Sequence, residues 1–166
     1  MGTFFIADTH FSEDNIRRYE NRPFASPEEM DEALILNWNN AVSGNDEVFM
    51  LGDFGADGRE NCILNRLNGR KLLLKGNHDV RTNDFYRNAG FDEVYDLPVL
   101  YKGFWLLSHE PLYINSNMPY ANIFGHVHAN PMFKDFSSQH FCVSAERINY
   151  TPVSFEEIVR KVKESR

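Results

Sequence analysis

The stretch Ile123-Phe124-Gly125-His126-Val127-His128, read as IFGHVH, places two histidines directly after a short apolar run. A buried strand has no structural need for two imidazoles at its end, because histidine is not a typical residue of an apolar core. The pair therefore needs another explanation. That explanation depends on where the other polar residues of the chain fall.

Five apolar runs of this chain end in residue types that bind metals. The runs FFIA, EVFML, KLLLK, FWLLS and NIF lead into Asp8-Thr9-His10, Gly52-Asp53, Gly76-Asn77-His78-Asp79, His109 and Gly125-His126-Val127-His128. Five of the six histidines lie in these places, and only His140 lies elsewhere. One such histidine alone is equally well explained as a hydrogen-bonded turn residue. In open α/β sheets, however, ligands gather outside the carboxyl ends of the strands, so five motifs predict one shared crevice.

The apolar runs alternate with longer polar or amphipathic segments. Strand cores are predicted at residues 4–7, 48–51, 72–74, 94–100, 104–107, 123–124 and 141–143. Helices are predicted at residues 26–42, 59–67 and 82–89, and from Ser154 to the C-terminal end, with capping boxes at Ser26 and Ser154. The runs at 94–100 and 104–107 are typical of a hairpin. Helices between the early strands and a hairpin later indicate a mixed α/β sandwich, formed by residues 1–166 as a single domain.

The charge of the chain limits its partners. With 17 basic and 24 acidic residues, the net charge is -7, which disfavours an extended nucleic-acid footprint. A small anionic substrate remains compatible, because a bound metal inverts the local field. We expect no membrane span and a cytoplasmic location, since no run of about 18 apolar residues and no signal peptide is present. Cys62 and Cys142 form no CxxC pair and are expected to be reduced and buried.

The candidate donors are imidazoles, carboxylates and one amide oxygen, without a thiolate. This set suits two divalent transition-metal ions such as Mn, Fe, Zn, Ni or Co better than a calcium cage. Seven donors are too many for one tetrahedral ion, but they suffice for two ions if one carboxylate bridges them. Two ions about 3.5–4 Å apart clamp the attacking and leaving oxygens of an in-line displacement at phosphorus.

The order of motifs D-x-H, GD, GNHD, H and GHxH resembles the calcineurin-like metallophosphoesterase superfamily, and the match runs from Asp8 to His128. The NRPF stretch at residues 21–24 and the tail NYTPVS at 149–154 are similar to a small bacterial and phage branch. The resemblance implies a metallophosphoesterase-type αββα sandwich, with two packed mixed β-sheets flanked by helices. It also implies a hydrolase with a dinuclear, for example manganese, centre.

The resemblance implies a role for each donor. The implied metal ligands are Asp8, His10 and His128 for the first ion, Asn77, His109 and His126 for the second, and Asp53 as the bridge. A hydroxide that bridges the ions would attack phosphorus, and His78 would act as general acid toward the leaving oxygen. The expected substrate is a small phosphodiester or phosphomonoester, with a slight preference for the diester.

Other polar residues have two interpretations each. Asp79 either orients the ring of His78, or it caps the helix that begins near Thr82 or has another structural role. Arg22 is a candidate phosphate clamp, whereas Arg17 and Arg18 suit a solvated helix face as well as a substrate contact. Many members of the branch carry a further histidine soon after D-x-H, but residues 11–15 here read FSEDN. Substrate contacts in that region are therefore expected to differ.

Two alternative functions remain open from the sequence. The same fold can serve as a catalytically silent scaffold for protein interaction, although such relatives tend to lose the histidine of GNHD, which is His78 here. A nuclease acting on nucleic-acid ends is the second alternative, because a short footprint tolerates an acidic protein. The sequence does not specify the oligomeric state.

Overall fold

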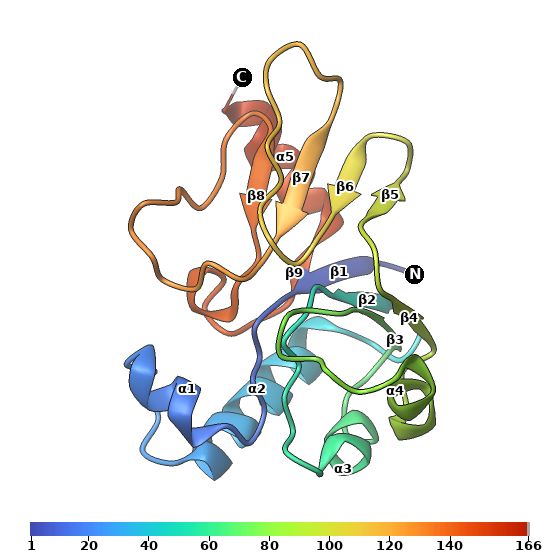
Figure 1. Cartoon of the computed structure of the whole chain (residues 1–166), viewed down its shortest axis with the longest axis vertical. Coiled ribbons are helices and arrows are strands. Elements are labelled where there is room, and N and C mark those ends of the chain that lie inside the picture. Colours follow the sequence, from blue (N-terminus) through green and yellow to red (C-terminus); the bar gives the residue numbers. More distant parts are fainter. Residues whose placement is uncertain (166) are drawn as a thin grey trace.

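The computed structural model describes residues 1–165 and contains two mixed β-sheets with helices around them (Figure 1). The first sheet has the strand order β4-β3-β2-β1-β9, with β1 (Thr3–Ile6), β2 (Glu47–Met50), β3 (Arg70–Leu74), β4 (Glu93–Tyr95) and β9 (Val153–Ser154). The second has the order β5-β6-β7-β8, with β5 (Val99–Tyr101), β6 (Trp105–Leu107), β7 (Ala121–Phe124) and β8 (His140–Cys142). The helices are α1 (Asp14–Tyr19), α2 (Pro27–Ala41), α3 (Glu60–Leu64), α4 (Asn83–Ala89), the 3₁₀ helix η1 (Ala145–Arg147) and α5 (Phe155–Glu164).

Most neighbouring strands run parallel. In the first sheet, β1 to β4 are parallel to one another, and only β9 is antiparallel, to β1. In the second sheet, β5 and β6 form the predicted antiparallel hairpin, while β6, β7 and β8 are parallel. Parallel neighbours end at the same edge of a sheet, so the loops after β1, β2 and β3 lie together, as do those after β6 and β7.

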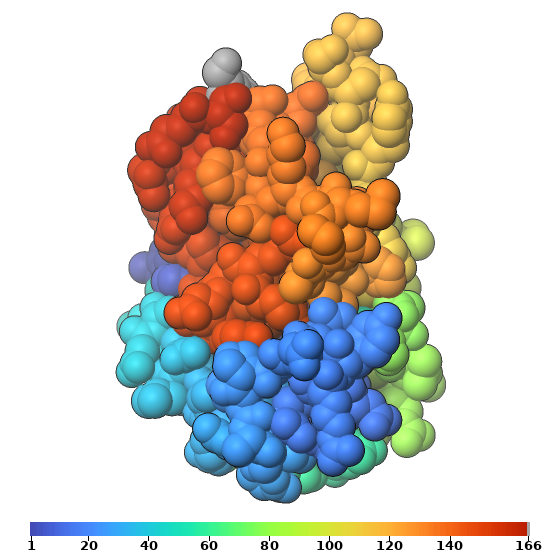
Figure 2. Space-filling view, turned by 90° about the vertical axis from the view of Figure 1, so that its left-hand side faces the viewer, coloured from blue at the N-terminus to red at the C-terminus, as the bar shows by residue number. Residues whose placement is uncertain are grey.

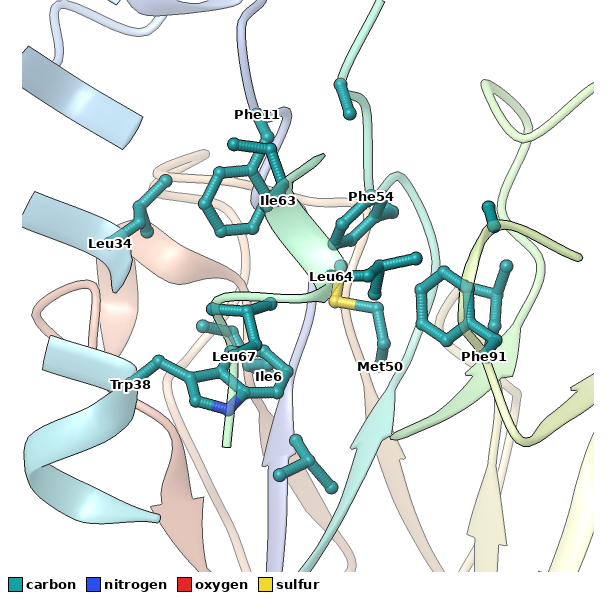
Figure 3. Close-up of a cluster of buried hydrophobic side chains, with 14 of the residues drawn as sticks. Ile6, Phe11, Leu34, Trp38, Met50, Phe54, Ile63, Leu64, Leu67 and Phe91 are labelled. Atoms are coloured by element: carbon teal, nitrogen blue, oxygen red, sulfur yellow. The ribbon is translucent and has the colours of Figure 1, made fainter. Parts of the chain in front are cut away.

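Alternate side chains of the first sheet enter two separate cores. On one face, Ile6, Met50 and Leu73 pack against α2, α3 and α4, where Trp38 and Leu64 are buried (Figure 3). On the other face, residues of the same strands pack against the second sheet and α5; they are Phe5, Phe49, Leu72 and Leu74. Because both faces are covered, these strands are apolar along their length and do not alternate with polar residues.

Helices α2 and α5 begin directly after Ser26 and Ser154, the two capping residues that the sequence predicted. Ser26 Oγ accepts the backbone N–H of Glu29 at 3.1 Å, and Ser154 Oγ accepts that of Glu157 at 3.2 Å. Thr82 caps α4 by accepting the N–H of Phe85 at 3.2 Å. The carboxylate of Glu29 reaches back to the N–H of Ala25, one residue before the cap. These caps satisfy backbone donors that the first turn of a helix leaves free.

Several expectations from the sequence are corrected. Residues 94–100 are not one strand, because Asp96-Leu97-Pro98 separates β4 from β5 and carries the chain from the first sheet to the second. The helix expected at 59–67 is shorter, and the two-residue strand β9 was missed. Cys62 is exposed, whereas Cys142 is buried as expected. Among residues 1–165, no helix combines the length and the apolar character that crossing a membrane requires.

Candidate metal centre

The five strand-end motifs meet at one place, where the loops of the two sheets are joined by hydrogen bonds. The loop after β1 lies on the loop after β2, since the N–H of Asp8 donates to Gly52 O and that of His10 to Asp53 O, both at 3.0 Å. The carboxylate of Asp8 then accepts the N–H of His126, at the end of β7, at 2.8 Å. This last bond ties the two sheets together at the crevice that the sequence predicted.

Three donor atoms form a tight triangle on one side of the crevice. Asn77 Oδ1 lies 2.9 Å from His109 Nε2 and 3.1 Å from His126 Nδ1, and the two imidazole nitrogens are 3.1 Å apart. The Nδ1 of His109 is bonded to Leu51 O at 2.8 Å, so in the neutral ring its Nε2 would present a lone pair. Three potential acceptor atoms this close together require a ring proton or a cation among them. The triangle is therefore an arrangement that a metal ion would stabilise.

A second set of donors lies on the other side of the crevice. Ligand atoms of Asp8, His10 and His128 all lie within 4.8 Å of one another. Asp8 and His10 are fully buried, and among residues 1–165 the buried atoms Asp8 Oδ1 and His10 Nε2 have no hydrogen-bond partner. Burial raises the pKa of Asp8, since the carboxylate loses its hydration. Buried polar atoms without partners are rare in proteins, and a cation is one of the groups that satisfies them.

The carboxylate of Asp53 lies between the two sets. Its Oδ2 is 3.6 Å from His10 Nε2 and 3.3 Å from His109 Nε2, while its Oδ1 accepts the N–H of His78 at 2.9 Å. Burial opposes the ionised carboxylate, but the bond and charge of His109 outweigh it and lower the pKa of Asp53 to about 2. Burial likewise opposes the imidazolium of His109, yet Asp53 raises the pKa of His109 to about 9. Both shifts indicate that this site stabilises positive charge.

Outer hydrogen bonds orient three of the imidazoles in the same way. The Nδ1 of His10 is 2.9 Å from Glu13 Oε2, and that of His128 is 3.1 Å from Glu146 Oε1, just as the Nδ1 of His109 faces Leu51 O. Metal-ligating histidines typically donate their second ring N–H to a carboxylate or carbonyl, which fixes the tautomer. The residues present therefore fit two divalent transition-metal ions that share Asp53.

The backbone at the crevice is held in an uncommon conformation. Five of the seven candidate ligands have φ between 45° and 70°, namely Asp8, His10, Asp53, His126 and His128. A non-glycine residue in the left-handed region costs about 1–3 kcal/mol, and such strain is concentrated at functional sites. The glycines that precede the donors allow the loops to approach closely. A Cβ at Gly52 would overlap the ring of His109, and one at Gly125 would overlap Ala7 and crowd the carboxylate of Asp8.

His78 stands at the mouth of the crevice. Its side chain is exposed, its ring lies 5.2 Å from that of His10 between centroids, and its backbone N–H is held by Asp53. Together with Glu13, Asp57 and Arg81, it lines a pocket beside the donor sets. The ring can therefore meet a group bound at the crevice without being one of the inward-facing donors.

Arg22 is not available to substrate, which corrects the expectation of a phosphate clamp. Its buried side chain donates to Asp8 O at 2.5 Å and Thr9 O at 2.7 Å, and it pairs with Glu146 at 2.7 Å. The guanidinium thus holds the D-x-H loop from behind. Arg17 and Arg18 both pair with Asp14 at 2.7 Å. Arg18 is exposed on the helix surface, whereas Arg17 is only 15% exposed and also donates to Phe24 O at 2.8 Å.

Asp79 has a structural role, as one interpretation of the sequence allowed, but it neither caps a helix nor orients His78. Its Oδ2 accepts the N–H groups of Asp53 at 2.7 Å and Gly76 at 2.9 Å, and its Oδ1 accepts that of Phe54 at 3.2 Å. Both oxygens are therefore occupied by backbone amides and do not orient the ring of His78, and Thr82 caps α4 instead. Burial raises the pKa of Asp79, although the amide bonds oppose this shift. Asp79 positions the GD and GNHD loops against each other.

Sequence reasoning missed the two carboxylates that orient the imidazoles. Glu13 follows His10 by three residues and offered a weak local signal. Glu146 lies 18 residues beyond His128, on η1, and no motif marks it. Burial opposes its ionisation, but His128 and Arg22 lower the pKa of Glu146 to about 2.

The fold and the crevice define a mixed α/β protein with a candidate metal centre at the carboxyl ends of its strands. The chain belongs to the family of the uncharacterized protein MJ1445 of Methanocaldococcus jannaschii, with 36% identity across 98% of this chain and 92% of that protein. It is 35% identical to the gene 66 protein of Mycobacterium phage D29 over 52% of this chain and 44% of that protein.

One solved structure is similar over nearly the whole chain. It is the crystal structure of AQ665, a protein of unknown function from Aquifex aeolicus, with a TM-score of 0.72 and 28% identity over 96% of this chain and 98% of that chain. No family model matches the sequence. The comparisons therefore support the fold and the family.

Proposed function

We propose that this chain is a metal-dependent phosphoesterase of the calcineurin-like metallophosphoesterase type, with an αββα sandwich and two divalent ions. The observation that carries the proposal is the position of Asp53 Oδ2, within 3.6 Å of His10 Nε2 and 3.3 Å of His109 Nε2. One carboxylate placed between two donor sets is the arrangement that a dinuclear centre requires. Asp8, His10 and His128 would hold one ion, and Asn77, His109 and His126 the other.

The charges of the donors support a phosphate substrate. When bound, two divalent ions supply Lewis acidity that attracts a phosphate oxyanion and promotes the ionisation of water. Asp8 and Asp53 contribute two negative charges to the crevice, and Asn77 contributes a neutral oxygen. The seven donors therefore leave the loaded centre positive, although the chain as a whole is acidic.

His78 supplies the proton that the reaction needs. When the oxygen of the ionised water bonds to phosphorus and the bond to the leaving oxygen breaks, the alkoxide retains the electron pair and accepts a proton from the protonated ring of His78. General-acid help of this kind typically contributes about 10²–10⁴-fold. The bond to Asp53 holds the backbone of His78 beside the crevice. The acid and the metal ligands are thus positioned by the same carboxylate.

Hydrolysis of bis-p-nitrophenyl phosphate and p-nitrophenyl phosphate with Mn²⁺ tests the proposal. We expect turnover of both, faster for the diester, and loss of turnover after chelation or in Asp53→Asn. His140→Ala removes a histidine outside the crevice and is expected to keep the activity. Two bound equivalents of Mn²⁺ without turnover of either ester would contradict the proposal and favour a silent scaffold.

A further inference from the structure

A second pocket opens beside the metal ligands His126 and His128, and His78 is not among its lining residues. It measures about 650 Å³ and is lined by Tyr19 and Glu20 at the C-terminal end of α1, by Pro111 after β6, and by His126, His128 and Phe133 of the loop after β7. Figure 2 shows the blue region of α1 directly below the orange loop that follows β7. None of these residues lines the pocket of His78. A group attached to a phosphate at the metal ligands could therefore extend in either of two directions.

The lining of this second pocket is aromatic and almost uncharged. Tyr19 and Phe133 contribute rings that are 83% and 37% exposed, and Val127, Ala129 and Pro131 add apolar surface. Among residues 1–165, Glu20 is the single charged residue of the lining, and neither lysine nor arginine lines the pocket. A further phosphate would meet repulsion here, whereas a flat apolar group would cover rings that now face water.

The wall that carries Phe133 is already held in place. Arg147 of η1 donates to the carbonyl oxygens of His128 at 2.6 Å, Asn130 at 2.5 Å and Phe133 at 3.0 Å, and it pairs with Asp135 at 2.7 Å. Its side chain is only 9% exposed. A loop fixed by one guanidinium does not have to be ordered when a ligand binds, so the pocket is suited to recognition.

We infer that this pocket receives an aromatic group carried by the phosphate ester, so that the preferred substrates are aryl- or nucleoside-type esters with one phosphate. The inference rests on the proposed function and adds the substrate class. Because the leaving oxygen must face His78, the occupant of the second pocket is the substituent that stays on phosphorus. Tyr19 and Phe133 are then the residues that determine specificity.

The test compares two diesters that share a leaving group, phenyl p-nitrophenyl phosphate and methyl p-nitrophenyl phosphate. The protein loaded with Mn²⁺ is expected to show a kcat/KM at least about tenfold higher for the phenyl ester, since stacking on aromatic side chains is strong. Tyr19→Ala and Phe133→Ala should each raise KM for the phenyl ester, with little change in kcat and little change for the methyl ester. Tyr113→Ala removes a tyrosine that is 85% exposed and outside the pocket, and it should preserve the ratio.

A binding measurement separates this inference from the proposed function. Phenylphosphonate and methylphosphonate are titrated calorimetrically into the same proteins, and the metal content of each variant is measured. Tighter binding of phenylphosphonate that Tyr19→Ala and Phe133→Ala abolish, with metal content unchanged, would support the pocket even without turnover. Turnover of both esters at equal kcat/KM, with equal binding of both phosphonates, would overturn the inference and leave the phosphoesterase proposal intact.

Discussion

His126 Nδ1 lies 3.1 Å from His109 Nε2, although the two histidines follow different strands and are 17 residues apart. Since Leu51 O engages the other nitrogen of His109, this contact needs either a proton or a cation between the two ring nitrogens. Asn77 Oδ1 completes the triangle with an atom that cannot donate a proton. This contact is the reason for testing metal binding before catalysis.

Mn²⁺ is expected to stabilise the protein against heat. At a hundredfold excess over its Kd, a ligand that binds only the folded state adds about 2.7 kcal/mol. For a chain of this size, such a gain raises the Tm by about 5–10 °C. Differential scanning fluorimetry with and without a chelator measures the shift. An unchanged Tm at saturating Mn²⁺ would argue against a preformed centre.

Asp53→Asn is expected to lose both ions together, because one carboxylate serves both donor sets. The substitution keeps the shape of the side chain and removes its charge. Mass spectrometry of the metals in purified protein provides the measurement, and His140→Ala is the control with an intact crevice. Two full equivalents retained by Asp53→Asn would show that Asp53 is not a shared ligand.

His78→Ala is expected to retain both ions and to lose about 10²–10⁴-fold in kcat for esters with poor leaving groups. The loss should be smaller for p-nitrophenyl esters, since p-nitrophenolate leaves without a proton. Alkyl and p-nitrophenyl esters are compared in steady-state assays alongside the metal content. If the metal content falls in this variant, His78 is a ligand and not the acid.

Arg22→Met is expected to lower the free energy of unfolding by about 3–5 kcal/mol, because it leaves the buried Glu146 with His128 alone and the carbonyls of Asp8 and Thr9 without their donor. Arg18→Met is the matched control. Arg18 is 73% exposed and pairs with Asp14 at the surface, so its loss should change stability by less than about 1 kcal/mol. Urea unfolding of the metal-free proteins measures both. Similar stabilities for the two variants would contradict the buried role of Arg22.

Asp46→Asn is expected to reduce the sensitivity of folding to acid. The hydroxyl of Ser43 and the N–H groups of Gly2 and Ser43 bind this carboxylate and lower its pKa from 3.8 to about 2. The stabilisation is therefore present above pH 3.8 and is lost as the pH falls toward 2. Urea unfolding between pH 5 and 2 should show a shallower decline in the variant, and an equally steep decline would exclude the effect.

Local sequence patterns predicted most of the helices and strands. The predictions were wrong where the structural partners of a residue lie far away in the sequence. Ser26 and Ser154 cap α2 and α5, as their capping boxes predicted. Thr82 caps α4, which was expected to begin near this residue. The run at 94–100 looked continuous, because apolar residues flank Asp96-Leu97-Pro98 on both sides. Only the packing of two sheets decides that the chain changes sheets there. Arg22 was similarly misread, since nothing near it in the sequence reveals Glu146.

The sequence by itself determined which donors this protein can offer and that each follows a strand, because apolar runs, glycines and histidines are local features. The tertiary structure alone decided how those donors meet. Parallel pairing of β1, β2 and β3, and of β6 and β7, brings their ends to one crevice, and Asp8 joins the two sheets through His126. It also assigned Glu146, Arg147 and Asp79 to supporting roles. Hydrogen bonds between distant residues depend on strand register and sheet packing, which local sequence does not encode.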